Sequence, residues 1–216
     1  MNHFSITGGS GNIATEVVKV LKTNDCKIDI FSRDLMLNLH DDKVSIFPTL
    51  DYSEVKFNLK SNKLLICNGL FSYSKIEDLS LTKIEDLIYA NYTVVVKIIY
   101  QFLKSTDPDM QRDIFVLGSS AAYDLGANIG IYASTKLALT GLITSLNKEY
   151  RELNTRFAII STGTINNKMG LDVPGQDVDT LLNPREVAIQ IASYLQNIGN
   201  SFQPEVLIRR RFMQGH

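Results

Sequence analysis

Short apolar runs alternate with longer amphipathic stretches along the chain. The runs are rich in Ile, Val, Leu or Phe, which is typical of short strands buried on both faces of a sheet. The predicted strands are Phe4–Thr7, Lys27–Phe31, Val44–Phe47, Leu64–Cys67, Ile114–Leu117, Phe157–Ile160 and Glu205–Ile208. No internal repeat or Pro/Ser/Gly-rich linker interrupts this pattern, so it predicts a single domain over residues 1–216.

Helical periodicity fills several of the intervals between these strands. The predicted helices are Asn12–Thr23, Leu79–Lys104, Ile131–Leu153 and Pro184–Gln196. The last of them is preceded by Asn183, a good N-cap, and begins with a proline at its first position. Alternating strands and helices predict an α/β fold, a doubly wound parallel sheet of about seven strands with helices on both faces. Ligands of such sheets bind in the crevice at the carboxyl ends of the strands.

Composition narrows the classes of partner. Hydrophobic residues make up 44% of the 216 residues and charged residues 21%, and the net charge is −1. A protein this close to neutral has no strong field to attract nucleic acid or an anionic membrane. The sequence shows neither a signal-peptide pattern nor an apolar stretch near the roughly 20 residues of a membrane span, so we expect a cytoplasmic protein. The cysteines Cys26 and Cys67 and the three histidines show no metal-ligand spacing, so no metal is expected.

A glycine-rich segment, Thr7–Ala14, lies between the first predicted strand and the first predicted helix. Glycines allow a positive φ and close backbone approach, and free N–H groups at a helix start attract a pyrophosphate. Ala14 stands where a small residue lets the helix pack on the sheet. Many tight strand–helix turns also contain two glycines, but the position directly after a strand favours dinucleotide binding.

The second predicted strand is followed by Ser32, Arg33 and Asp34. A guanidinium can hold a 2′-phosphate with two hydrogen bonds, so Arg33 favours NADP. The alternative is that Arg33 is an ordinary surface residue and that Asp34 contacts the ribose hydroxyls, as in NAD-binding proteins.

A tyrosine and a lysine four residues apart, Tyr132 and Lys136, open the third predicted helix, and this spacing puts both on one face. A free phenol has a pKa of about 10, and lowering it to about 7 takes some 4 kcal/mol of preferential phenolate stabilisation. A nearby lysine and a positive nicotinamide ring could supply much of that. An isolated Tyr-x-x-x-Lys is more often a chance surface pair, but Ser119 and Ser120 follow the predicted fifth strand and bring hydroxyls to the same crevice.

Together these motifs resemble the short-chain dehydrogenase/reductase family over nearly the whole chain, which implies a Rossmann fold. The glycine turn is similar to the family's Thr-Gly-x-x-Gly-x-x-Gly form, with Ala14 in place of the last glycine. Cys67-Asn68-Gly69 resembles its Asn-Asn-Ala-Gly element, with the first asparagine lost. Asp51 resembles the family's adenine-contacting aspartate, and Asn91 resembles its helix-four asparagine. The segment Ser161–Asn167 resembles the family's segment beside the nicotinamide and departs from it at Thr162 and Asn167.

The resemblance implies a role for each of these residues. Tyr132 is the general acid for reduction or the base for oxidation, and Lys136 lowers its pKa and bonds the nicotinamide ribose. Ser120 polarises the substrate carbonyl, although Ser119 has the commoner thirteen-residue distance to Tyr132, and Asn91 anchors a proton-relay water. The implied cofactor-binding residues are Gly8, Ser10, Gly11, Asn12, Ile13, Arg33, Asp51, Asn68, Gly69, Tyr132, Lys136 and Ile165.

The functional hypothesis is an NAD(P)-dependent oxidoreductase that reduces a ketone or aldehyde with NADPH, NAD remaining possible. The alternatives are a nucleotide-sugar epimerase, dehydratase or reductase, and a non-catalytic NADP-binding sensor. The expected partner is a small-molecule carbonyl or alcohol substrate, in a compact or open pocket because the lid segment Gly170–Asn183 is short and polar. The two long predicted helices, Leu79–Lys104 and Ile131–Leu153, could pack against their copies, so we expect a homodimer or homotetramer.

Overall fold

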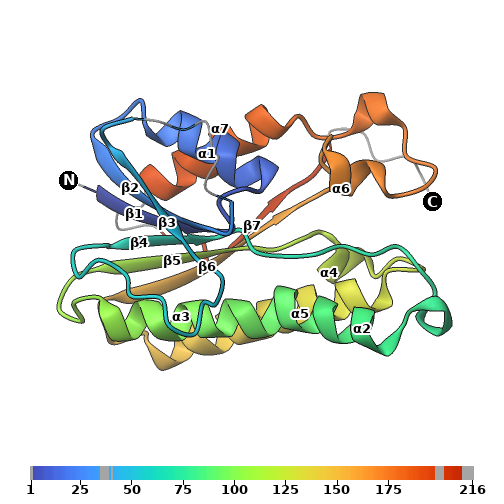
Figure 1. Cartoon of the computed structure of the whole chain (residues 1–216), viewed down its shortest axis with the longest axis horizontal. Coiled ribbons are helices and arrows are strands. Elements are labelled where there is room, and N and C mark those ends of the chain that lie inside the picture. The colour runs from blue at the N-terminus through green and yellow to red at the C-terminus, as the bar shows by residue number, and fades with distance from the viewer. Residues whose placement is uncertain (1, 35–38, 40, 198–201, 211–216) are drawn as a thin grey trace.

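A computed structural model describes residues 2–34, 39, 41–197 and 202–210. In this part of the chain seven strands form one sheet in the order β3-β2-β1-β4-β5-β6-β7, and every neighbouring pair is parallel (Figure 1). The predicted doubly wound parallel sheet is therefore confirmed. The strands are β1(Asn2–Thr7), β2(Cys26–Ser32), β3(Val44–Pro48), β4(Lys63–Ile66), β5(Arg112–Leu117), β6(Thr155–Thr162) and β7(Glu205–Ile208).

The two outer strands depart from the predicted burial. β1, β4 and β5 are buried almost throughout, as their apolar composition indicates. β3 and β7 lie at the sheet edges, and most of their residues are exposed or half-buried. The expectation of burial on both faces is wrong for these two, because an edge strand has a neighbour on one side only and the flanking helices cover it less completely.

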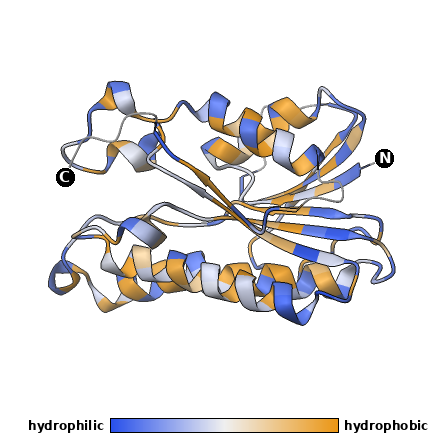
Figure 2. Ribbon diagram, turned by 180° about the vertical axis from the view of Figure 1, so that it is seen from behind, coloured by the Kyte–Doolittle hydropathy of each residue, from blue (hydrophilic) through white to orange (hydrophobic). Residues whose placement is uncertain are grey.

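Helices cover both faces of the sheet (Figure 1). α1(Asn12–Leu21) and α7(Pro184–Gln196) pack together on one face, and α3(Val94–Ser105) and α5(Gly130–Glu149) lie on the other. Hydrophobic residues gather along the strands and the helices that flank them (Figure 2). None of the described residues between β2 and β4 is helical. No helix in the described ranges is long and apolar enough to cross a membrane.

The predicted helix Leu79–Lys104 consists of three successive elements. Ser80 caps α2(Leu81–Ile88) by accepting a hydrogen bond from the backbone N–H of Lys83 at 3.1 Å. A π-helical turn, η2(Tyr89–Thr93), then leads into α3. The shorter elements η1(Ile76–Asp78), α4(Ala121–Asp124), α6(Lys168–Leu171) and η3(Val178–Thr180) lie in loops, and the loops that hold α4 and α6 follow the carboxyl ends of β5 and β6.

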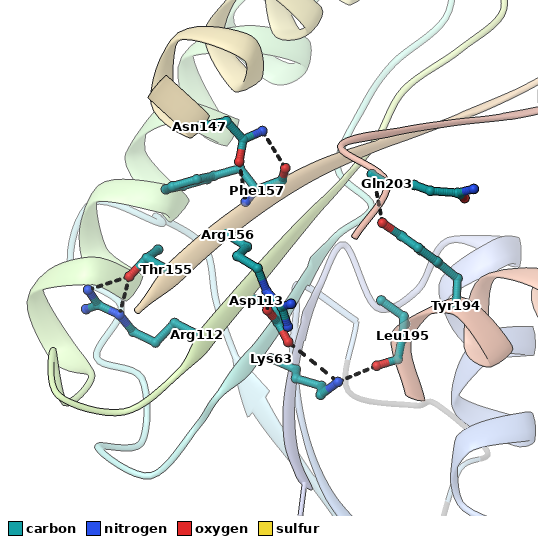
Figure 3. Close-up of polar contacts among 10 residues, drawn as sticks. All are labelled: Lys63, Arg112, Asp113, Asn147, Thr155, Arg156, Phe157, Tyr194, Leu195 and Gln203. Atoms are coloured by element: carbon teal, nitrogen blue, oxygen red, sulfur yellow. Dashed lines mark hydrogen bonds and ion pairs between the residues drawn. The ribbon is translucent and has the colours of Figure 1, made fainter. Parts of the chain in front are cut away.

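A buried ion cluster lies at the amino ends of β4, β5 and β6 (Figure 3). The Asp113 carboxylate lies 2.8 Å from Arg156 Nε and 3.7 Å from Lys63 Nζ. Lys63 also donates a hydrogen bond to the carbonyl oxygen of Leu195, in the last turn of α7, where a cation is favoured by the helix dipole. Asp113 thus compensates two cations and, through Lys63, connects the sheet to α7.

We expect Asp113→Asn to lower the free energy of unfolding by about 3–5 kcal/mol, because it leaves buried cations without their carboxylate. Urea unfolding followed by circular dichroism measures the change. The matched control is Glu16→Gln, which breaks the surface pair between Glu16 and Lys19 (2.6 Å) and should cost below about 1 kcal/mol. Equal losses for the two variants would contradict the role given to Asp113.

Candidate active site

A pocket of about 260 Å³ opens at the carboxyl ends of the strands. It lies between the segment after β4, the loop that holds α4, the first turn of α5 and the segment that follows β6. The side chains that matter most at its wall are Phe71, Tyr73, Ser119, Ser120, Asp124, Tyr132, Ile165, Met169 and Gln176. Its volume is at the small end of ligand pockets, which usually measure about 300–1,000 Å³.

Tyr132 and Lys136 lie in the first two turns of α5 and are both buried, with 8% and 4% of their surface exposed. Lys136 Nζ lies 5.8 Å from the centroid of the Tyr132 ring and donates a hydrogen bond to the carbonyl oxygen of Leu117 at 3.1 Å. Burial lowers the pKa of Lys136 from its ordinary 10.5 to about 8, and the nearby Cys67 thiol opposes that change. The ammonium group is therefore held in the site at a cost in solvation.

The pKa of Tyr132 moves in the direction opposite to that expected. Burial raises it above its ordinary value, and a hydrogen bond with the Ser119 hydroxyl opposes the rise. Lys136 directs its ammonium at Leu117, so it is not among the causes that act on the phenol. The expected lowering is therefore not a property of the Tyr132–Lys136 pair alone.

The two candidate serines have different environments. Ser119 Oγ accepts a hydrogen bond from the backbone N–H of Ala121 at 3.2 Å. Ser120 is the N-cap residue of α4, and its backbone N–H donates to the carbonyl oxygen of Thr162 at 2.9 Å. Both serines line the pocket, and of the two it is the Ser119 hydroxyl that lowers the pKa of Tyr132.

Asn91 lies in the π-helical turn η2 and is completely buried. Its side-chain oxygen accepts a hydrogen bond from the backbone N–H of Leu70 at 2.8 Å, and its side-chain nitrogen donates to the Leu70 carbonyl oxygen at 2.9 Å. A β-carbon added at Gly69 would lie 2.8 Å from the Asn91 oxygen, so this close approach requires glycine. Phe71 then packs edge-on against the Tyr132 ring, with centroids 4.9 Å apart.

The glycine turn fits a dinucleotide phosphate. Gly8 has a φ of +69°, and a β-carbon there would lie 2.9 Å from the backbone nitrogen of Asn68. Gly11 is the N-cap residue of α1 and contributes no side chain to the cap, so the first backbone N–H groups of the helix face outward. The buried side-chain oxygen of Asn68 has no hydrogen-bond partner among the described atoms, which leaves it available to a ligand.

The remaining predicted cofactor residues lie along the same edge. Ser10 and Asn12 are exposed in the turn, and Ile13 is buried under it. Arg33 and Asp51 are exposed beyond the ends of β2 and β3, and the Asp51 carboxylate accepts a hydrogen bond from the Ser53 backbone N–H at 2.8 Å, which lowers the pKa of that carboxyl. The last of these residues, Ile165, is buried at the pocket wall.

Two aromatic residues at the pocket were missed from the sequence, Phe71 and Tyr73. The Tyr73 hydroxyl accepts a hydrogen bond from the side-chain amide of Asn128 at 3.1 Å, which joins the segment after β4 to the segment before α5. Their position in the sequence could have identified them as pocket residues. Both follow Gly69 within four positions, just past the carboxyl end of a central strand.

Comparison with known proteins identifies the family. A family model described as "short chain dehydrogenase" matches residues 52–176, more than half of the chain. The chain belongs to the short-chain dehydrogenase family. It is therefore an oxidoreductase that acts between alcohol and carbonyl groups with a nicotinamide cofactor. No curated protein sequence matches the chain.

Solved structures of short-chain dehydrogenases share the fold of this member. A short-chain dehydrogenase/reductase from Vibrio parahaemolyticus is 17% identical, with a TM-score of 0.82 and 99% of each chain covered. An alcohol dehydrogenase from the archaeon Thermococcus sibiricus, complexed with 5-hydroxy-NADP, is 20% identical, with a TM-score of 0.84 and coverage of 100% of this chain and 99% of that one. ElxO with NADP bound is 20% identical, with a TM-score of 0.81 and coverage of 96% and 97%.

We expect Lys136→Met to raise the free energy of unfolding at pH 7 by roughly 1–3 kcal/mol. The difference between 10.5 and about 8 corresponds to roughly 3 kcal/mol of lost solvation, and the lost bond to Leu117 offsets part of that gain. The unfolded chain holds this proton up to pH 10.5 and the folded chain only up to about 8, so wild-type stability should rise with pH between these values.

Urea unfolding at several pH values measures both effects. The variant should lack the rise between pH 8 and 10.5, whereas Lys148→Met, at an exposed position on the same helix, should keep it and change stability by less than about 0.5 kcal/mol. A Lys136→Met protein less stable than the wild type at pH 7 would show that the buried ammonium does not destabilise the fold.

Proposed function

We propose that this short-chain dehydrogenase reduces a small ketone or aldehyde with NADPH and that Tyr132 donates the proton. The observation that carries the proposal is the placement of the buried Tyr132 phenol at the wall of a pocket that Ser119 and Ser120 also line, close to Lys136. A phenol with a raised pKa keeps its proton at neutral pH, as a general acid for reduction must.

Each residue has a part in this chemistry. When bound, NADPH supplies the hydride. Tyr132 passes its proton to the carbonyl oxygen, and a serine hydroxyl donates a hydrogen bond to the same oxygen and polarises it. We assign that role to Ser119 in preference to Ser120, because the Ser119 hydroxyl is the one that acts on the pKa of Tyr132. Lys136 would bond the nicotinamide ribose and, when charged, would favour the phenolate that remains after transfer.

Asn91 contributes to the site by positioning the segment after β4. Both polar atoms of its side chain are bonded to Leu70, so its amide holds Gly69 and Phe71 in place beside Tyr132. The family role as anchor of a proton-relay water stays a prediction.

The cofactor we propose is NADP. The glycine turn, with Gly8, Ser10, Gly11, Asn12 and Ile13, would hold the pyrophosphate. Asp51, Asn68 and Gly69 would border the adenosine, Tyr132, Lys136 and Ile165 would lie beside the nicotinamide ribose, and Arg33 would bind the 2′-phosphate. Two structures of similar fold contain NADP or its 5-hydroxy derivative, which supports this choice, and NAD remains the alternative.

The pocket favours a small uncharged substrate. Among its described lining residues only Asp124 carries a charge at neutral pH, and its carboxylate is paired with Arg209 at 2.8 Å. Aromatic and aliphatic side chains, including Phe71, Ile129 and Met169, form much of the remaining wall. No lining cation would neutralise an anionic substrate, so we propose a neutral, largely apolar carbonyl compound.

We also propose a homodimer or homotetramer. Val96 and Tyr100 on α3 and Leu137 on α5 are large apolar side chains exposed on the outer side of that helical layer. Pairing of these helices with their copies would cover them.

We expect Tyr132→Phe to reduce turnover of any accepted carbonyl substrate at least about 100-fold, because it removes the proton donor and keeps the ring that packs on Phe71. NADPH oxidation across a panel of neutral aldehydes and ketones is the measurement. Tyr150→Phe, at the opposite end of α5 from Tyr132, is the matched control and should retain full turnover. Turnover within twofold of wild type in Tyr132→Phe would show that Tyr132 is not the general acid.

In the same assay Ser119→Ala should lose more activity than Ser120→Ala.

We expect Arg33→Ala to weaken NADPH binding about 10- to 100-fold and to leave NADH binding unchanged, because charge-assisted hydrogen bonds to a phosphate contribute about 1.5–3 kcal/mol. Fluorescence titration with each cofactor measures the dissociation constants, and Lys56→Ala, an exposed residue of the loop between β3 and β4, is the control. Equal affinity of the wild type for both cofactors, unchanged by Arg33→Ala, would contradict the NADP assignment.

A further inference from the structure

Tyr52 lies beside the proposed adenosine site, directly after Asp51 in the loop that follows β3. Only 7% of its surface is exposed, and it belongs to the apolar cluster on the α3/α5 face that also contains Phe31 and Phe57. A buried phenolic hydroxyl must find partners for its donor and its acceptor. The partners that it finds are main-chain groups of two other segments.

The Tyr52 hydroxyl accepts a hydrogen bond from the backbone N–H of Gly8 at 3.3 Å and donates one to the carbonyl oxygen of Phe31 at 3.2 Å. Gly8 is the first glycine of the turn after β1, and Phe31 comes two residues before Arg33 at the end of β2. Because β3, β2 and β1 are neighbours in the sheet, one hydroxyl joins the carboxyl ends of all three.

Backbone pairing of Thr7 with Phe31 and the close packing of Gly9 on the Ile30 side chain bring the glycine turn against β2. Direct hydrogen bonds from the turn itself to β2 are weaker. The direct bond from the Gly9 N–H to the Phe31 carbonyl oxygen is 3.5 Å long, at the limit of a hydrogen bond, whereas the bond from the Gly11 N–H to the Gly8 carbonyl oxygen (2.9 Å) lies within the turn itself. Gly8 has a φ of +69°, and in this conformation its N–H donates a hydrogen bond to the Tyr52 hydroxyl. The Tyr52 hydroxyl adds to these contacts a bridge from the Gly8 N–H to the end of β2 and to the loop after β3.

We propose that Tyr52 is a positioning residue for the adenosine half of the dinucleotide, which it prepares by holding the glycine turn in register with the ends of β2 and β3. This inference rests on the cofactor site proposed above. The proposed effect of Tyr52 concerns only the adenosine half of that site. Tyr132 and Lys136 lie on α5, which follows β5, and β1 and β4 separate β5 from β2 in the sheet. Loss of the hydroxyl should therefore weaken the binding of an adenosine fragment and spare a nicotinamide fragment.

The experiment compares two fragments of NADPH on wild-type protein and Tyr52→Phe by isothermal titration calorimetry. We expect the Kd of 2′,5′-ADP to rise about tenfold, equivalent to ~1.4 kcal/mol, and the Kd of reduced nicotinamide mononucleotide to stay within twofold. Tyr150→Phe is the matched control. It removes a hydroxyl from a ring packed against the same apolar cluster at the C-terminal end of α5, where Tyr150 contacts Phe157 of β6, and should change neither Kd.

An equal loss of affinity for both fragments would show a general structural role, and unchanged affinity for both would show no role; either result overturns the proposal. Wild-type protein that binds neither ADP nor 2′,5′-ADP would overturn the dinucleotide site itself and the inference with it. Amide hydrogen exchange by NMR gives a second test that needs no variant. The Gly8 N–H should be protected in the free wild-type protein, and exchange at the rate of an unstructured peptide would contradict the bond to Tyr52.

Discussion

The pair of hydrogen bonds between the Asn91 amide and the backbone of Leu70 is the contact on which the geometry of the site depends. It joins the long helix segment to the loop after β4, at a point where the π-helical turn brings Asn91 into full burial. Gly69 has no room for a side chain because of it, and Phe71 is left packed against Tyr132. The Asn91 amide thus positions Gly69 in the proposed cofactor site and Phe71 at the substrate pocket.

The two ends of the sheet treat buried charge differently. At the amino end, Asp113 compensates both Lys63 and Arg156, and the cluster connects the sheet to α7. At the carboxyl end, no described carboxylate pairs with Lys136, which has a carbonyl oxygen as its hydrogen-bond partner and a lowered pKa. Uncompensated charge is destabilising in a folded chain and is typical of functional positions. The proposed catalytic role of Lys136 accounts for its persistence there.

The adenosine side of the site is organised by side-chain contacts. None of the described residues between β2 and β4 forms a helix, and β3 is a partly exposed edge strand. The Tyr52 hydroxyl joins the glycine turn to the ends of β2 and β3, and the Phe31 ring packs against Phe47 and Phe57 on the same side. These contacts of the Tyr52 hydroxyl and the Phe31 ring join the carboxyl ends of three neighbouring strands.

The positions of the seven strands, of the main helical segments and of the glycine turn could be predicted from the sequence. These features depend on local periodicity and on residues adjacent in the chain, whose backbone preferences act wherever the segment lies. The four-residue spacing of Tyr132 and Lys136 is local in the same sense, so their common face could be predicted, as could the parallel sheet that follows from strand–helix alternation.

Three features could be found only in the folded protein: which serine acts on the pKa of Tyr132, in which direction that pKa moves, and which groups the Tyr52 hydroxyl bonds. The same is true of the exposure of β3 and β7, which follows from their place at the sheet edges. Each of these depends on contacts between residues distant in the chain and on the water that such contacts exclude. Burial and hydrogen-bond partners of this kind are properties of the packed molecule, and no spacing along the sequence encodes them directly.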